Sequence, residues 1–176
     1  MTRLNSTYET AIITWIAGNI TDITATKVVW DKQAAPRPAL PYVTVNIMPP
    51  VDETGMIPES GYTATDVWTM THRFRIGVSI NIIANENYLA KMQQLIISLD
   101  KDSVRTALKA AGLYFRYAED SVDLTELLDS GYEFRIQKDF VFGYVATTTE
   151  AINEIRRIIL GIDMGEVEIA VDETVT

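Results

Sequence analysis

Residue types that perform acid–base or metal chemistry are sparse in this chain. Its 176 residues include one histidine, His72, and no cysteine. Thiolate catalysis and cysteine-ligated zinc or iron–sulfur sites are therefore excluded, and one histidine cannot form a His-rich metal motif. His72 lies in an apolar register between Met70 and Phe74, which favours a structural role over that of a catalytic base. We expect no catalytic residue, no cofactor-binding residue and no metal site.

Carboxylates are plentiful, and one group of them is regularly spaced. Asp120, Asp123, Glu126 and Asp129 recur every three residues in a polar stretch. Such spacing is typical of a solvated surface, and the alternating aspartates of a calcium loop are missing. A glycosidase-type pair is set by distance in space, not by spacing in sequence. A small α+β enzyme or ligand-binding domain that uses a carboxylate pair or His72 therefore stays open as the alternative function.

Arginines recur on the polar side of two long alternating segments. Arg73 and Arg75 belong to the first segment and Arg135 to the second, and Arg116 joins them if the strands are neighbours. One interpretation is cross-strand pairing with nearby acids such as Glu133. The other is a contact surface for an acidic partner segment, because the arginine fork binds carboxylates bidentately.

A long loop or hairpin tip is expected from Pro49 to Thr65, which holds three prolines and two glycines. Connections of this length are often functional. Its isolated apolar residues Met56, Ile57 and Tyr62 favour an arm that packs on a neighbouring subunit over a disordered excursion.

These residues must be positioned by elements that periodicity predicts. Within residues 67–83, two registers alternate over fifteen residues, from Trp68 to Ile82. This pattern indicates a long, half-buried antiparallel strand that bends at Gly77 or projects. Apolar stripes at helical spacing and capping residues predict three helices. The second helix is expected to be capped by Asn85 or Asn87. The third is expected to be capped by Asp102 and to end at Gly112. The expected helices cover about 6–18, 87–99 and 102–112, and the other expected strands cover 27–31, 42–48, 113–118 and 132–145.

The order of these elements predicts an α+β fold: a single antiparallel β-sheet with helices packed on one face and a long projecting β-hairpin. One domain is expected over residues 1–176, with a core over about 5–148 and a C-terminal extension over 149–176. In that extension the isoleucines fit either a helical stripe or strands, while Val167, Ile169 and Val171 alternate as a strand does.

Charge narrows the class of partner. The chain carries 24 acidic and 15 basic residues, a net charge of −9, which argues against general binding of nucleic acid or of anionic membranes. No hydrophobic run is long enough to span a bilayer and no signal peptide is recognisable, so a soluble intracellular product is expected. The acids are unevenly placed: residues 119–133 hold six and residues 163–176 hold five, with no base in either segment. The acidity is therefore concentrated in two segments, and the rest of the chain is nearly neutral.

Several motifs together resemble a known family. They are the capped N-terminal helix, the Pro36-Arg37-Pro38…Pro41-Tyr42-Val43 run, the Arg73-Phe74-Arg75-Ile76 strand, the two helices with Val104-Arg105, and the Tyr132-Glu133-Phe134-Arg135-Ile136 strand. Over roughly residues 5–148 they resemble the neck or tail terminator (tail completion, head–tail joining) proteins of tailed bacteriophages.

The resemblance implies a non-enzymatic virion protein of the neck, assembled in the host cytoplasm. It implies a homohexameric ring that ends the tail tube and joins the tail to the head connector. The implied partners are the chain itself, the tube and sheath proteins and the connector proteins. In such a ring, the two acidic segments are expected to meet the arginines of a neighbouring subunit or to line a lumen through which DNA passes. No sequence-specific nucleic acid and no membrane is expected as a partner. The residues expected at subunit or partner interfaces are Arg73, Arg75, Arg116, Arg135, Met56, Ile57 and Tyr62.

Overall fold

The computed structural model describes residues 6–31, 36–49, 51–52, 59–64, 67–128, 131–151, 158–163 and 166–171. The chain divides into two compact units. Unit 1 comprises Met1–Thr54 and Arg73–Val145, and unit 2 comprises Gly55–His72 and Ala146–Thr176. The predicted α+β class is confirmed, because α-helices and a large sheet occupy separate stretches of the chain.

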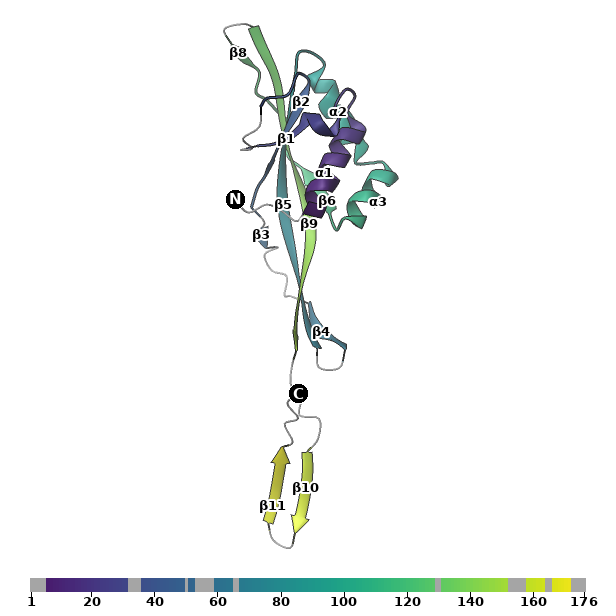
Figure 1. Ribbon diagram of the computed structural model, residues 1–176, viewed down its shortest axis with the longest axis vertical. Helices are drawn as coiled ribbons and strands as arrows, with labels where there is room; N and C mark the ends of the chain where they lie inside the picture. The colour runs from purple at the N-terminus through teal and green to yellow at the C-terminus, as the bar shows by residue number, and fades with distance from the viewer. Residues whose placement is uncertain are drawn as a thin grey trace. The chain divides into compact units, whose positions relative to one another are not determined.

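The sheet runs in the order β1-β2-β5-β9-β6 (Figure 1). Its path is formed by β1 (Val28–Trp30), β2 (Tyr42–Ile47), β5 (Val67–Ala84), β9 (Gly131–Ala151) and β6 (Tyr114–Ala118). Three short strands of unit 1 join it: β3 (Val51–Asp52) pairs with β5, while β7 (Val122–Asp123) and β8 (Glu126–Leu128) pair with β9. The long alternating strands predicted from periodicity are thereby confirmed.

One pairing departs from the predicted antiparallel sheet. β1 and β2 are parallel, with Val28 in register with Val43, whereas β2 and β5 are antiparallel, with Val45 opposite Ile80. The physical reason is the length of the connection: a parallel neighbour requires the chain to return to the same end of the sheet, and a tight turn cannot do this. The proline-rich segment between β1 and β2 provides that return.

Helices cover one face of the sheet in unit 1, as predicted (Figure 1). They are α1 (Ser6–Asn19), α2 (Tyr88–Ser98) and α3 (Asp102–Ala110), and a 3-10 turn, η1 (Ala25–Lys27), precedes β1. Trp15 of α1 packs edge-on against Phe140 and Phe142 of β9, with ring centroids 5.2 and 5.7 Å apart. Its indole N–H donates to Ser98 Oγ at 2.9 Å. This buried side chain therefore ties two helices to the centre of the sheet.

The end of α3 is set by Gly112, as its sequence position predicts. Gly112 has a φ of +85°, a conformation that costs glycine little. Its N–H donates to Lys109 O, and the N–H of Leu113 donates to Leu108 O, both at 2.9 Å. This is a Schellman motif. The predicted side-chain caps are not formed: Asn87 and Lys101 hold the N-cap positions without a side-chain bond, and Asp102 lies inside the first turn.

β5 is buried on both faces in its second half. Ile76, Val78, Ile80 and Ile82 are at most 1% exposed, as their register predicts. Polar residues of the other face are also buried, at 6% exposure for Ser79 and Asn81, so the expected half-buried strand is a fully covered one here. Gly77 of β5 leaves room for Met48, whose Cε lies 2.2 Å from where a Cβ at position 77 would stand.

Unit 2 contains strands alone among its described residues. β4 (Glu59–Ala64) pairs antiparallel with the first residues of β5, with Gly61 opposite Thr69. β10 (Ile158–Asp163) and β11 (Glu166–Val171) form a separate two-stranded antiparallel sheet. The strand alternative for the C-terminal region is thus correct, and the sheet is not single. Among the described residues, no helix is long and apolar enough to cross a membrane.

Candidate partner interface

β5 and β9 are neighbours in the sheet, so the condition for a shared arginine surface is met. The four predicted arginines nevertheless do not form one strip. Arg135 bonds within the fold, Arg75 is partly covered, and Arg73 and Arg116 line a surface hollow. These three arrangements differ in how far each guanidinium group can contact another protein.

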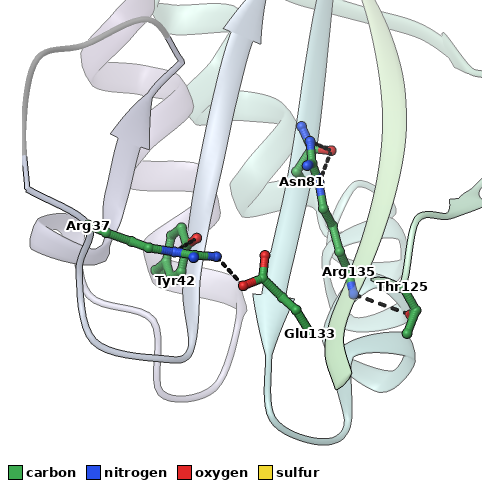
Figure 2. Close-up of polar contacts among 6 residues, drawn as sticks. All are labelled: Arg37, Tyr42, Asn81, Thr125, Glu133 and Arg135. Atoms are coloured by element: carbon green, nitrogen blue, oxygen red, sulfur yellow. Dashed lines mark hydrogen bonds and ion pairs between the residues drawn. The ribbon is translucent and has the colours of Figure 1, made fainter. Parts of the chain in front are cut away.

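Arg135 is a structural residue. Its Nε and Nη2 both donate to Asn81 Oδ1, at 3.2 and 3.1 Å, and its main-chain N–H donates to Thr125 Oγ1 at 3.4 Å (Figure 2). Asn81 is only 6% exposed, and a buried amide oxygen needs a donor. Arg135 therefore supplies a buried acceptor of β5 with its partner.

Arg75 is half-buried. It lies in register with Val51 of β3. Its Nε is buried, and no acceptor for it is found among the described residues. An unsatisfied buried donor costs stability. Arg75 stays a predicted interface residue.

Arg73 and Arg116 come together as predicted. They line one hollow with Phe74, Tyr114, Gly143, Tyr144 and Val145, from three adjacent strands, and its volume is about 260 Å³. The stem of Arg116 lies beside Gly143 of β9: a Cβ at position 143 would stand 3.6 Å from Arg116 Cδ, which is an ordinary contact distance. The hollow combines two cationic groups with aromatic surface and has no acidic residue in its lining.

The predicted pairing of the arginines with Glu133 is wrong. Glu133 instead forms an ion pair with Arg37 of the proline-rich segment, and the Arg37 Nε donates to the Tyr42 hydroxyl (Figure 2). The guanidinium also lies 5.2 Å from the centre of the Tyr42 ring. The Arg37 Nη2 donates a hydrogen bond to the Glu133 carboxylate, and this bond raises the pKa of Arg37 above its ordinary value. Sequence reasoning missed Arg37, although an arginine between two prolines is a side chain held on a stiff backbone.

The paired strands β8 (Glu126–Leu128) and the start of β9 (Gly131–Ala151), together called the β8–β9 hairpin, present two large apolar side chains to solvent. Leu127 and Tyr132 are in register and are 71% and 67% exposed. Tyr132 stacks on Phe134, which in turn stacks on Tyr88, with centroids 6.2 and 5.5 Å apart. Glu126, opposite Glu133 in the same hairpin, is also exposed. Isolated exposed apolar residues are ordinary, but two large ones paired across neighbouring strands favour a contact site.

The base of this hairpin is braced by Asp123. Its carboxylate accepts from the Thr125 hydroxyl at 2.6 Å, the Thr125 N–H at 2.9 Å and the Tyr88 hydroxyl at 2.9 Å. These hydrogen bonds lower the pKa of Asp123, with the Thr125 hydroxyl contributing most. Among the acids that recur every three residues from Asp120, Asp123 therefore has a structural role.

The remaining predicted site residues are not brought together by the described structure. Tyr62 lies in β4 in register with Trp68, and Met56 and Ile57 lie outside the described residues. His72 lies within β5. Within the part of the chain that the structure describes, no three His, Asp or Glu side chains gather as a metal-binding group.

The sheet of unit 1 ends in a strand that is open to solvent. β6 is the last strand of the order, and Tyr114, Phe115 and Tyr117 are 45%, 36% and 45% exposed. The unpaired main-chain groups of an edge strand recruit other chains, and folded proteins usually shield them. β6 also provides Tyr114 and Arg116 to the hollow. Edge and hollow share Tyr114 and Arg116 and so form one continuous surface, which is suited to holding another protein.

Comparison with protein families agrees with an assembly role. The family model described as phage neck terminator protein matches residues 7–169. The chain therefore belongs to the phage neck terminator family and is a structural protein of the phage virion. The match includes β10 and part of β11, beyond the end of the resemblance found in the sequence. Comparison with curated proteins finds no match.

Proposed function

We propose that this neck protein forms a homohexameric ring that ends the tail tube and joins the tail to the head connector. The observation that carries the proposal is the open edge at β6, with its three exposed aromatic residues. An edge of this kind adds a strand or hairpin from another chain through main-chain hydrogen bonds. In a neck protein, the next subunit of a ring is a natural occupant of such an edge.

Ring closure needs a heterologous contact, in which one patch meets a different patch on the next subunit. The two edges of the sheet differ as a heterologous contact requires: β6 is antiparallel to β9, while β1 is a three-residue strand parallel to β2. We propose Arg73 and Arg116, which lie beside the β6 edge, as the main interface residues among those predicted from the sequence. Met56, Ile57 and Tyr62 remain proposed contacts to a neighbouring subunit.

The proposed partners are the tail tube and sheath proteins and the head–tail connector proteins. The net charge of −9 disfavours binding of nucleic acid, which suits a lumen through which DNA passes without adhering. The ring would assemble in the host cytoplasm and remain in the neck of the virion. This role needs no catalytic step, no cofactor and no membrane.

Tube assembly tests the proposal directly. Tube protein of the same phage is polymerised with and without this chain, and tube lengths and ends are measured by negative-stain electron microscopy. Short tubes with a sixfold ring at one end are expected with the chain, and open-ended growth without it. Tubes of unchanged length, together with a chain that stays monomeric in their presence, would contradict the proposal.

A further inference from the structure

Three aromatic rings lie in a row at the end of the sheet where β8 pairs with β9. Tyr132 stacks on Phe134 with ring centroids 6.2 Å apart, and Phe134 stacks on Tyr88 of α2 at 5.5 Å. Leu127 of β8 is in register with Tyr132. Tyr132 and Leu127 are 67% and 71% exposed, whereas Phe134 and Tyr88 are half-buried. These four residues, which we call the aromatic patch, therefore lead from the fold into solvent.

We propose that the aromatic patch binds a basic segment of another virion protein. An arginine or lysine of that segment lies over the Tyr132 ring, and an apolar side chain of it packs against Leu127. The inference rests on the proposed role in the neck and names the chemistry by which a partner is held. No residue of the patch belongs to β6 or lines the Arg73/Arg116 hollow, so the proposal concerns a surface other than the one proposed for ring closure.

The ring of Tyr132 is suited to a cation. It stacks on Phe134 on one side, and its large exposure leaves the ring accessible to a partner. A cation over a tyrosine ring is attracted by the negative face of the ring. The chain already makes one such contact nearby: the Arg37 guanidinium lies 5.2 Å from the centre of the Tyr42 ring and pairs with Glu133, the residue after Tyr132.

The charge around the patch selects a basic partner. Residues 119–133 carry six acids and no base. Three bases from elsewhere bond to this segment, namely Arg37, Arg135 and Lys138, so the acids stay in excess. The Asp123 carboxylate accepts from the Tyr88 hydroxyl at 2.9 Å, which places a negative charge beside the patch. Attraction between exposed charges acts over about 10 Å, so the other acids draw a basic segment in without touching it.

These observations favour a protein segment over other ligands. The excess of acids repels the phosphates of nucleic acid and anionic lipid headgroups. A small ligand is held in an enclosed site that buries most of its surface, whereas Leu127 and Tyr132 are mostly exposed. A second copy of this chain brings a further net charge of −9 to an acidic surface. A different protein with a basic segment is therefore the better match.

The patch is held in place before a partner arrives. Asp123 fixes the Tyr88 hydroxyl and also accepts from the Thr125 hydroxyl and N–H, and the stacked ring of Phe134 joins Tyr88 to Tyr132. A side chain that is already ordered loses less conformational entropy on binding. Tyrosine is also frequent among the residues that dominate binding energy at interfaces. Tyr132 is therefore the expected anchor of the contact.

A probe peptide tests this surface. A short peptide of alternating arginine and leucine is titrated into the full chain, and binding is measured by calorimetry at low and high salt. The affinity should fall about 10-fold in Tyr132→Ser and in Leu127→Ser. It should be retained in Tyr132→Phe, which keeps the ring. It should also fall as the salt concentration rises, because opposite charges attract the peptide.

Matched controls separate the patch from the rest of the surface. Ile97→Ser removes an apolar side chain of α2 that is 62% exposed, and this variant should bind the peptide as the unmodified chain does. A peptide of alternating glutamate and leucine should not bind, because it carries the wrong charge. Thermal melts confirm that every variant folds.

The outcomes distinguish this inference from the proposed function. An arginine peptide that does not bind, or that binds Tyr132→Ser as well as the unmodified chain, would overturn the inference. Equal binding of the glutamate peptide, or a loss of self-association in Tyr132→Ser with peptide binding unchanged, would overturn it too. Tyr132→Ser should still form rings on tail tubes. Absence of rings from the unmodified chain would contradict the proposed function, while the peptide titration still decides whether the patch binds a basic segment.

Discussion

Two groups of arginines differ in the surroundings of their side chains. Around the base of the β8–β9 hairpin, Arg135 donates to the buried Asn81 oxygen, and Arg37 pairs with Glu133. About ten residues further along β9, Arg73 and Arg116 line a surface hollow among aromatic side chains. The first group pairs with Asn81 and Glu133 of neighbouring strands, and the second adds positive charge to an aromatic surface. Whether an arginine in an alternating strand has a structural role or a surface role therefore depends on the residues that face it in the folded chain.

The largest stability difference between the groups is expected at Arg135. Arg135→Met removes both donors from Asn81, which leaves a buried oxygen unsatisfied at a cost of about 1–3 kcal/mol in the free energy of unfolding. Arg116→Met, at an exposed position, should stay within about 0.5 kcal/mol of the unmodified chain. Urea titrations of the two variants make the comparison. Equal losses of stability would remove the distinction between the groups.

A smaller effect is expected at the pair of Arg37 and Glu133. The Arg37 side chain is 54% exposed, so solvent screens the pair and its contribution should be about 0.2–1 kcal/mol. In the Arg37→Met background, Glu133→Gln should be neutral or stabilising, because Glu133 then faces Glu126 without a cation. A double-mutant cycle at low and high salt measures this. A coupling free energy of zero between Arg37 and Glu133 at low salt would show that the pair does not stabilise the fold.

The smallest effect is a pH dependence at Asp123. Its pKa is lowered in the folded chain, chiefly by the Thr125 hydroxyl, so its contribution to stability is fully present above the ordinary carboxyl pKa. That contribution is lost as the pH falls below about 4 and through the lowered value. An NMR titration of Asp123 should show a midpoint below the ordinary value, and Thr125→Ala should move the midpoint upward. An unchanged midpoint in Thr125→Ala would show that the hydroxyl does not brace the hairpin.

Local pattern predicts much of this fold, and tertiary contacts decide the rest. Alternation over residues 67–83 and a glycine at 112 are sufficient for β5 and for the end of α3, because each depends on neighbours in the chain. The parallel pairing of β1 with β2 depends on the path of a connection, which periodicity does not encode. The burial of both faces of β5 likewise depends on segments far away in sequence.

The candidate site divides in the same way. The sequence predicts arginines on adjacent strands, and Arg73 and Arg116 do share a hollow. It does not distinguish them from Arg135, whose partner Asn81 is 54 residues away, or reveal Arg37, whose partner Glu133 is 96 residues away. Nor does it mark Leu127 and Tyr132 as exposed, because an apolar residue in a strand is ordinarily expected to be buried.

The length of β9 has a mechanical consequence. This one strand, Gly131–Ala151, pairs with β8 at its start and lines the hollow through Tyr144, so its covalent main chain carries a force applied between those two surfaces. β9 is hydrogen-bonded to β5 on one side and β6 on the other. The bonds to antiparallel β6 run perpendicular to the strand, so they are loaded in shear and share the tension. A pull along β9 is therefore resisted by its neighbouring strands, while the packing of the three helices is spared.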